Sequence, residues 1–254
     1  MKICVLMVQV PATDAKVFPK EDKKYIETRD IKYVISPYDE FAIEEALKIK
    51  DKDGSEVFLL TVGPERAQTA IREGLALGCD RGVHILEEER YFDSHYISNL
   101  LANYLKKENP DLIFAGKLGV GFDHSQTGPM VAALLNLPFV NCVVEVKIEE
   151  RVAKVKREIE GASLFYEIKL PCILTAEKGL NTPRFASLKG IMAAKKKPIE
   201  TIKASDLFER KEMIELLSLE VPPQKGKGKI IPGDDPAKAA EELYKFLKDE
   251  AKLI

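Results

Sequence analysis

Stretches typical of buried strands alternate with stretches of helical period through the first half of the chain. The apolar runs that indicate strands lie at residues 3–10, 57–62, 82–86 and 112–115. The helical patterns between them begin at Ser36, Gly63 and Asp93. This order predicts an α/β fold with a mostly parallel, doubly wound sheet covered by helices on both faces.

The pattern changes after Pro138. Residues 139–148, 152–159 and 164–170 alternate weakly in polarity, which predicts added antiparallel strands, and residues 172–176 predict a further strand. We expect a nucleotide-binding α/β domain over residues 1–200 and a C-terminal arm and helix over residues 201–254. Residues 222–229 read as a linker before a helix that starts at Pro236. The apolar side of that helix must be buried on its own domain or on a partner chain.

The loop at residues 116–128 follows the fourth predicted strand and is rich in glycine and short polar side chains. Glycines allow close backbone approach to a ligand, and the start of the next helix favours an anion. In a parallel sheet the loops after Val10, Ile35, Val62 and Ala115 converge at one edge. The loop is therefore either a nucleotide-phosphate cradle or a surface loop that precedes a capped helix, and the pattern leaves both open.

Composition excludes several classes of protein. The 254 residues carry a net charge of -2, which argues against a nucleic-acid partner, and no run of about 18 apolar residues predicts a membrane span. Because the sequence enters a strand pattern directly, we expect a cytoplasmic protein. The four cysteines and three histidines lack metal-ligand spacing, and no nucleophile motif indicates catalysis. We expect buried reduced thiols and no catalytic residues or metal.

Residues 180–192 mix turn formers with apolar residues and precede a basic run at residues 195–197. One interpretation is a projecting contact loop with a basic shoulder. The other is a loop before a short helix whose apolar side belongs to the core, and the pattern alone favours this second interpretation.

Three groups of residues, taken together, resemble one family. They are Asp123-His124-Ser125-Gln126-Thr127-Gly128, Ser36-Pro37-Tyr38-Asp39-Glu40, and Arg184-Phe185-Ala186-Ser187-Leu188 followed by Lys195-Lys196-Lys197. In this order and spacing they resemble the beta subunit of electron transfer flavoprotein, as do Gly78-Cys79-Asp80-Arg81-Gly82 and Arg157-Glu158-Ile159-Glu160-Gly161. The resemblance covers residues 1–205, is specific as a set, and implies a sheet of the adenine-nucleotide alpha-hydrolase-like type.

The resemblance implies a heterodimer in which an alpha subunit holds most of the FAD and this chain buries AMP. Tyr38 is expected against the flavin ring, and Glu158 is expected to pair with a cation of the alpha subunit. Leu188, flanked by Arg184 and Lys196, is expected to dock on acyl-CoA dehydrogenase-type flavoenzymes. The cofactor-binding residues implied by position are Leu6, Ser36, Pro37, Tyr38, Asp39, Val62, Gly116, Lys117, Leu118, Gly119, Val120, Gly121, Phe122, Asp123, His124, Ser125, Gln126 and Thr127.

The same resemblance implies an electron carrier of fatty acid oxidation without catalysis of its own. Its acceptor would be of the electron transfer flavoprotein-quinone oxidoreductase type. The sequence departs from the family pattern at Gly121 and Phe122, where many relatives have aspartates, and at Ala193, where some have another lysine.

Alternatives remain open. An electron-bifurcating branch of the family uses NADH and binds a second FAD in place of AMP. Its loop usually reads Gln-Val-Gly-Pro, and Pro129 agrees with that branch, whereas the Thr127 hydroxyl favours a phosphate of AMP. Outside the family, an ATP-pyrophosphate hydrolase would need a fuller phosphate-binding signature after the first strand. An adenine-nucleotide-binding regulator would form a dimer with itself and carry no flavin.

Overall fold

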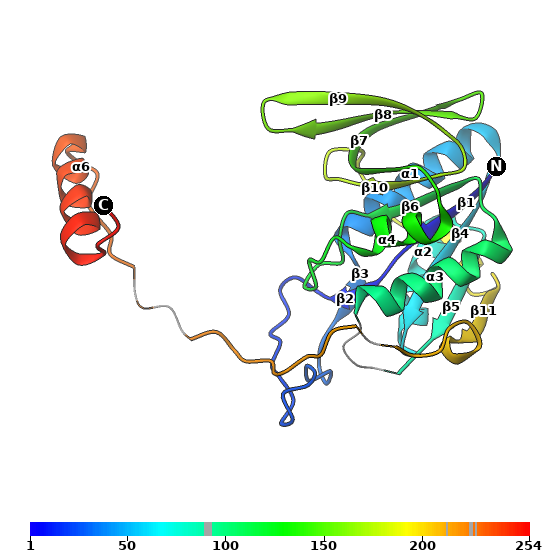
Figure 1. Cartoon of the computed structure of the whole chain (residues 1–254), viewed down its shortest axis with the longest axis horizontal. Coiled ribbons are helices and arrows are strands. Elements are labelled where there is room, and N and C mark those ends of the chain that lie inside the picture. The colour runs from blue at the N-terminus through cyan, green and yellow to red at the C-terminus, as the bar shows by residue number, and fades with distance from the viewer. Residues whose placement is uncertain (89–92, 212, 224–225, 227) are drawn as a thin grey trace. The chain divides into compact units, whose positions relative to one another are not determined.

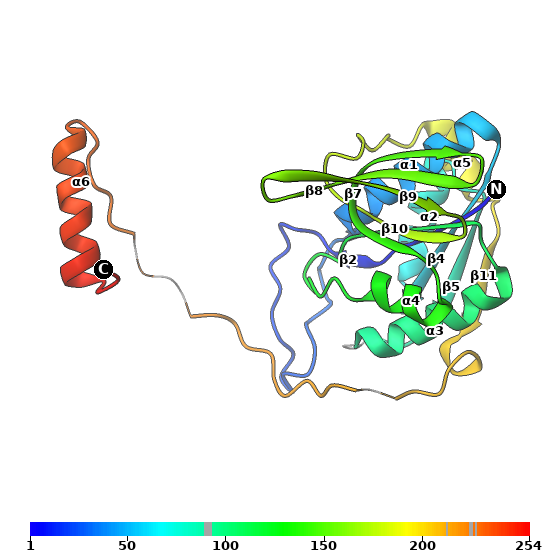
Figure 2. The same ribbon diagram turned by 45° about the horizontal axis from the view of Figure 1, so that its top comes forward.

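A nine-stranded sheet organises the residues described in this computed structural model, which are 1–88, 93–211, 213–223, 226 and 228–254. Its strand order is β11-β5-β4-β1-β6-β10-β7-β8-β9 (Figures 1 and 2). The parallel strands are β1 (Lys2–Leu6), β4 (Glu56–Gly63), β5 (Arg81–Leu86), β6 (Leu112–Gly116), β10 (Cys172–Ala176) and β11 (Ile199–Lys203).

The antiparallel part extends one end of this sheet. Strand β7 (Phe139–Glu149) runs parallel to β10 and antiparallel to β8 (Val152–Ile159), and β9 (Ala162–Lys169) completes the meander. The predicted mostly parallel sheet with added antiparallel strands is therefore confirmed. A separate small ribbon pairs β2 (Gln9–Pro11) with β3 (Tyr33–Ile35).

Helices cover both faces of the sheet (Figure 1). On one face, α1 (Pro37–Asp53) and α2 (Ala67–Leu77) bury apolar side chains such as Ile43 and Ile71, and α5 (Leu188–Ala194) packs on α2. On the other face, α3 (Ser94–Glu108) and α4 (Thr127–Leu135) pack over Leu6, Leu60 and Ala115. Each face thus has its own apolar core, as the doubly wound arrangement requires.

Local sequence signals set the helix ends. Pro37 occupies the first turn of α1, and the Asp93 side chain accepts a hydrogen bond of 2.6 Å from the Tyr96 N–H at the start of α3. Gly78 ends α2 with a φ of 137°. Cys4, Cys79 and Cys172 are buried free thiols, as expected, whereas Cys142 is half-buried.

The chain divides into two units, Met1–Glu220 and Val221–Ile254. The first unit includes β11, a short 3-10 helix η1 (Ala204–Asp206) and the segment up to Glu220. Docking of an arm that begins at residue 201 on a partner stays a prediction.

The second unit contains α6 (Pro236–Lys245), which Asp235 caps, and a π-helical turn η2 (Phe246–Glu250). The helix begins at Pro236, as predicted. Part of the predicted linker, residues 224, 225 and 227, lies outside the described residues. Among the described residues, no helix combines the length and apolar character needed to span a bilayer.

Candidate functional site

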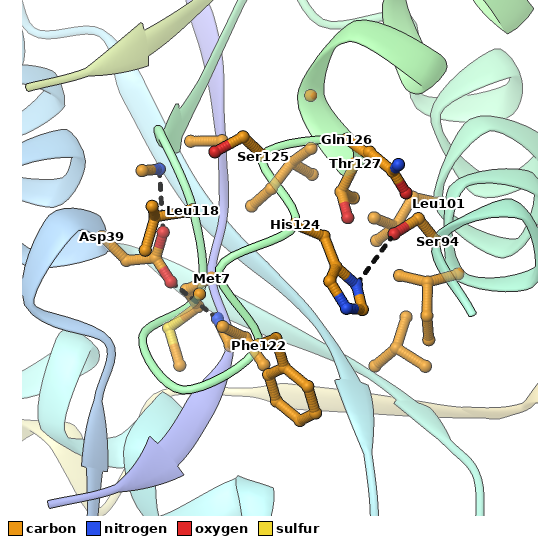
Figure 3. Close-up of a pocket in the computed structure, with 18 of the residues that line it drawn as sticks. Met7, Asp39, Ser94, Leu101, Leu118, Phe122, His124, Ser125, Gln126 and Thr127 are labelled. Carbon is orange, nitrogen blue, oxygen red and sulfur yellow. Dashed lines mark hydrogen bonds between the residues drawn. The ribbon is translucent and has the colours of Figure 1, made fainter. Parts of the chain in front are cut away.

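A cavity of about 160 Å³ opens at the carboxyl ends of β1, β4 and β6 (Figure 3). Strands β1 and β6 are neighbours, but the chain continues from β1 to α1 on one face and from β6 to α4 on the other. A crevice between diverging connections of this kind is where open α/β sheets bind ligands.

Most of the predicted cofactor-binding residues meet at this cavity. Those that line it are Leu6, Asp39, Val62, Gly116, Lys117, Leu118, Gly119, Phe122, His124, Ser125, Gln126 and Thr127. The others, which are Ser36, Pro37, Tyr38, Val120, Gly121 and Asp123, lie outside the lining. Ser36 still shapes the loop, because its hydroxyl lies 3.4 Å from the Leu118 carbonyl and 3.3 Å from the Val120 N–H.

The cavity also has an apolar side whose residues are not among those predicted from the sequence. Leu60 and Ala115 contribute from strands, and Ile97 and Leu101 contribute from α3. Met7, Val8, Asp93, Ser94 and Gly128 complete the lining. The residues directly after β1 could have been predicted, because ligands bind beyond the carboxyl ends of parallel strands, and so could the cap of α3. No local signal marks which side chains of α3 turn towards the cavity.

The loop between β6 and α4 uses several of its main-chain N–H groups internally. Those of Phe122 and Asp123 donate to the Gly119 carbonyl at 3.1 Å and 3.0 Å, and that of Gly121 donates to the Asp123 carboxylate at 3.2 Å. Gly121, Asp123 and Ser125 have φ values of 92°, 51° and 54°, so left-handed residues occur at every second position. In the part of the chain that the structure describes, no side chain caps the start of α4, so its first N–H groups remain available to a ligand.

Asp39 joins the ends of the two strands that border the crevice. Its carboxylate accepts hydrogen bonds of 2.8 Å from the Val8 N–H and from the Gly116 N–H. The side chain is 4% exposed, and this burial raises its pKa to about 7, although the two backbone hydrogen bonds act in the opposite direction. A Cβ atom at Gly116 would lie 2.5 Å from the Asp39 Oδ1, so only glycine fits beside this carboxylate.

The Lys117 side chain lines the cavity but is already paired within the chain. Its ammonium lies 2.7 Å from the Glu177 carboxylate and 4.6 Å from the centre of the Tyr38 ring. The hydrogen bond to Glu177 raises the pKa of Lys117. The ammonium therefore stays charged beside the Tyr38 ring, and the groups left to hold an anion in the cavity are mainly the first N–H groups of α4.

His124 lies between the loop and α3. Its Nδ1 is 3.4 Å from the Ser94 hydroxyl, and its ring centre is 6.3 Å from that of Phe122 (Figure 3). His84 is fully buried with its Nε2 2.9 Å from the Gly63 carbonyl, which agrees with a structural role. Within the described residues, no group of three histidine, cysteine or acidic side chains could hold a metal ion.

The segment at residues 180–192 differs from the pattern-based expectation. The apolar side of α5 faces outward, with Leu188 79% exposed, so the interpretation that this side belongs to the core is wrong. The helix is too short to bury two sides, and its small residues, Gly190 and Ala194, take the side that packs on α2. Lys196 is exposed near its end.

Two residues with predicted roles at partner surfaces have partners within the chain. Arg184 forms ion pairs of 2.8 Å with both Glu44 and Asp51 of α1. Glu158 lies 2.9 Å from the Lys156 ammonium and is 61% exposed. Contacts of Arg184 and Glu158 with other chains stay predictions.

Comparisons with known proteins agree on one family. A family model described as "Electron transfer flavoprotein domain" matches residues 24–207. The chain is 39% identical over 250 residues to "Electron transfer flavoprotein subunit beta" of Bacillus subtilis, which covers 94% of this chain and 97% of that protein. It is 37% identical over 258 residues to the mitochondrial beta subunit of Arabidopsis thaliana, with both chains fully covered. It is 35% identical to the beta subunit of Syntrophomonas wolfei, over all of this chain and 98% of that protein.

Proposed function

The chain belongs to the electron transfer flavoprotein family, as a beta subunit, and from this premise we propose that it buries AMP in the crevice beside β6. Its subunit character implies an alpha subunit as partner, and the family name implies a flavin in the complex. We further propose that this flavin is FAD held mainly by the alpha subunit. The flavin supplies the electron-transfer chemistry when bound, and this chain positions it without catalysis of its own.

The observation that carries the AMP proposal is the backbone of the loop between β6 and α4. This backbone ends at the uncapped start of α4, whose first N–H groups are available to a phosphate. The apolar side made by Leu60 and Leu101 suits a purine ring. A nucleoside monophosphate therefore matches both halves of the crevice.

A second FAD in place of AMP is the alternative, and it would mark an electron-bifurcating protein that uses NADH. Pro129 favours it, because this residue follows Gly128 in the bifurcating pattern. The Thr127 hydroxyl favours AMP, since it lines the cavity and can donate to a phosphate oxygen.

Ligand analysis separates these functions. The chain is co-expressed with its alpha subunit, the heterodimer is denatured, and the released nucleotides are identified by mass and absorbance. We expect one FAD and one AMP per heterodimer. Two FAD would establish the bifurcating alternative, and a heterodimer without adenine nucleotide other than the alpha-subunit FAD would reject the AMP site.

We also propose that the segment around Leu188 docks on acyl-CoA dehydrogenase-type flavoenzymes, from which the complex takes electrons in fatty acid oxidation. A quinone oxidoreductase-type flavoenzyme is the proposed acceptor. Leu188 is 79% exposed next to exposed lysines at positions 189, 195 and 196. An apolar anchor with a charged rim suits transient recognition, because the anchor gives affinity and the charges speed association.

The docking role is tested with Leu188→Ala. We expect slower electron transfer from a dehydrogenase at limiting heterodimer concentration and an unchanged FAD content. Wild-type kinetics for this variant would reject the docking role. Glu158 and Tyr38 are proposed at the alpha-subunit side of the chain, where Glu158 would pair with a cation and Tyr38 would approach the flavin.

A further inference from the structure

The segment at residues 184–192, called here the presenting loop, exposes its large apolar side chains. Leu188, Ile191 and Met192 are 79%, 45% and 59% exposed. Residues three and four positions apart share a helix face, so these three form one outward apolar stripe on α5. Phe185, just before the helix, is 96% exposed. This arrangement reverses the usual amphipathic helix of a monomeric protein.

The C-terminal side of the presenting loop is fixed on α2. A Cβ atom at Gly190 would lie 2.3 Å from the Ala76 carbonyl oxygen, which shows how closely the two backbones approach. The Arg72 guanidinium donates to the Ala194 carbonyl at 2.7 Å, and the Lys197 ammonium donates to the Leu75 carbonyl at 3.0 Å. Helix α5 therefore has a fixed position against the sheet domain.

The N-terminal side of the loop is fixed on α1 by a fork. The Arg184 Nε and Nη2 donate to the two oxygens of Glu44 at 2.8 Å and 3.1 Å, and the Arg184 backbone N–H donates to Glu44 at 3.1 Å. Asp51 accepts a further bond of 2.8 Å from Nη2. Charge-assisted, bidentate contacts of this kind are both strong and directional. Glu44 is only 7% exposed, so a docked protein could not reach it easily.

Resting on the proposed docking function, we propose that Phe185 is a second apolar anchor beside Leu188, and that Arg184 is a positioning residue that acts through Glu44. The matching partner surface is a flavoenzyme with adjoining apolar pockets in an acidic rim, since Lys189, Lys195 and Lys196 are all exposed around the stripe. The positive charge of these lysines favours a partner whose docking surface is negatively charged.

Rigidity at both ends explains how so small a surface can bind. Immobilising a loop at the moment of association lowers affinity, and a loop fixed beforehand avoids that loss. Large aromatic side chains at the centre of an interface contribute most of the binding energy. The fork therefore sets where Phe185 stands, and Phe185 with Leu188 makes the contact.

The fork is tested by a double-mutant cycle in the intact heterodimer, with a purified medium-chain acyl-CoA dehydrogenase as the probe. We expect Glu44→Gln and Arg184→Gln each to weaken docking by about tenfold, and the double variant to be no weaker than either single one. The KM for the heterodimer should rise while turnover at saturation and the flavin absorbance stay unchanged. Weaker docking for Arg184→Gln with wild-type docking for Glu44→Gln would assign Arg184 to direct contact and overturn its positioning role.

Trypsin gives a second measurement that needs no partner. Loosening the fork should speed cleavage after Lys189 in the Glu44→Gln heterodimer, because the loop then opens more often. Cleavage at the wild-type rate would contradict the positioning role independently of docking.

Phe185→Ala should weaken docking by about tenfold or more, whereas Phe185→Leu should retain most of the affinity. Phe165→Ala is the matched control, since Phe165 is 74% exposed on β9 and should leave docking unchanged. If Leu188→Ala weakens docking but Phe185→Ala does not, the docking function stands and the second anchor is wrong. If neither variant changes docking, the proposed docking function itself fails.

Discussion

Replacing Asp39 with asparagine tests how the crevice is held open. The carboxylate accepts from the Val8 N–H and the Gly116 N–H with separate oxygens, each at 2.8 Å. An asparagine of the same shape has one acceptor oxygen, and its NH2 group would face the second N–H. The variant therefore keeps one of the two connections between the ends of β1 and β6.

The effect of Asp39→Asn on the unfolding free energy depends on pH. Burial raises the pKa of Asp39 from 3.8 to about 7, which corresponds to about 4 kcal/mol. Between these values the folded chain holds the proton more tightly than the unfolded chain. The unfolding free energy of the wild type therefore falls as the pH rises from about 4 to about 7, and it levels off above.

Asparagine carries no charge and removes this dependence. The backbone N–H group that loses its acceptor in this variant, that of Val8 or of Gly116, lowers the unfolding free energy by about 1–3 kcal/mol at every pH. The variant should therefore be less stable than the wild type near pH 4 and more stable, by about 1–3 kcal/mol, at pH 8. Its AMP affinity at pH 8 should fall by about tenfold, because the crevice has lost one of its two connections.

Hydrogen exchange of the β1 and β6 amides in the heterodimer, recorded at several pH values, reports the unfolding free energy. Calorimetric titration of the AMP-depleted heterodimer reports the affinity. A variant that is more stable at pH 8 but binds AMP less tightly cannot be explained by general damage. A stability difference that is the same at pH 5 and pH 8 would refute the coupling to ionisation. Unchanged AMP affinity would refute the idea that the two Asp39 hydrogen bonds shape the crevice for AMP.

Two further predictions concern packing and domain organisation. Gly116→Ala should destabilise the chain by about 1–3 kcal/mol in chemical denaturation, because the added Cβ would lie 2.7 Å from the Tyr38 carbonyl carbon, whereas Gly233→Ala has open space and should have no effect. Ending the chain at Glu220 should preserve the thermal stability of the first unit but weaken association with the alpha subunit, which gel filtration would detect. Ending it at residue 200 should also lower the thermal stability, because Asp93 then loses the Met213 N–H that it binds.

Much of the fold follows from local sequence. Apolar runs and helix caps such as Pro37 and Asp93 locate the parallel strands and their helices, because each signal acts within a few residues. The antiparallel extension was also indicated, through the Glu160-Gly161 turn between β8 and β9. Sheet order could not be read, since the place of β10 between β6 and β7 depends on contacts between residues far apart in the chain.

The candidate site, like the fold, has features that local sequence predicts and features that it does not. Most residues of the loop after β6 line the cavity, because the carboxyl ends of parallel strands meet at one edge. Asp39 is predicted to contact the ligand and lines the cavity, but no local signal indicates that its carboxylate also accepts hydrogen bonds from two backbone N–H groups of this chain. The orientation of α5 was misjudged, because periodicity shows which residues share a face but not which face is outside.

Thr127 is where AMP and a second FAD can be told apart within one chain. Its side chain lines the cavity at the first position of α4, beside N–H groups that have no side-chain cap among the described residues (Figure 3). Thr127→Val keeps the shape but removes the hydroxyl, so a phosphate at this helix start loses one hydrogen bond. We expect about 2- to 12-fold weaker AMP binding, from the usual 0.5–1.5 kcal/mol of such a bond.

Thr201→Val on the exposed edge strand β11 is the control for the loss of a hydroxyl, and it should bind AMP as the wild type does. Equilibrium dialysis of AMP and of FAD against the nucleotide-depleted heterodimer measures both ligands. If Thr127→Val bound AMP with full affinity, the phosphate could not lie at the start of α4. Because the adjoining apolar side of the cavity would be unchanged, the ligand would then have to enter the crevice in another orientation or be a different nucleotide.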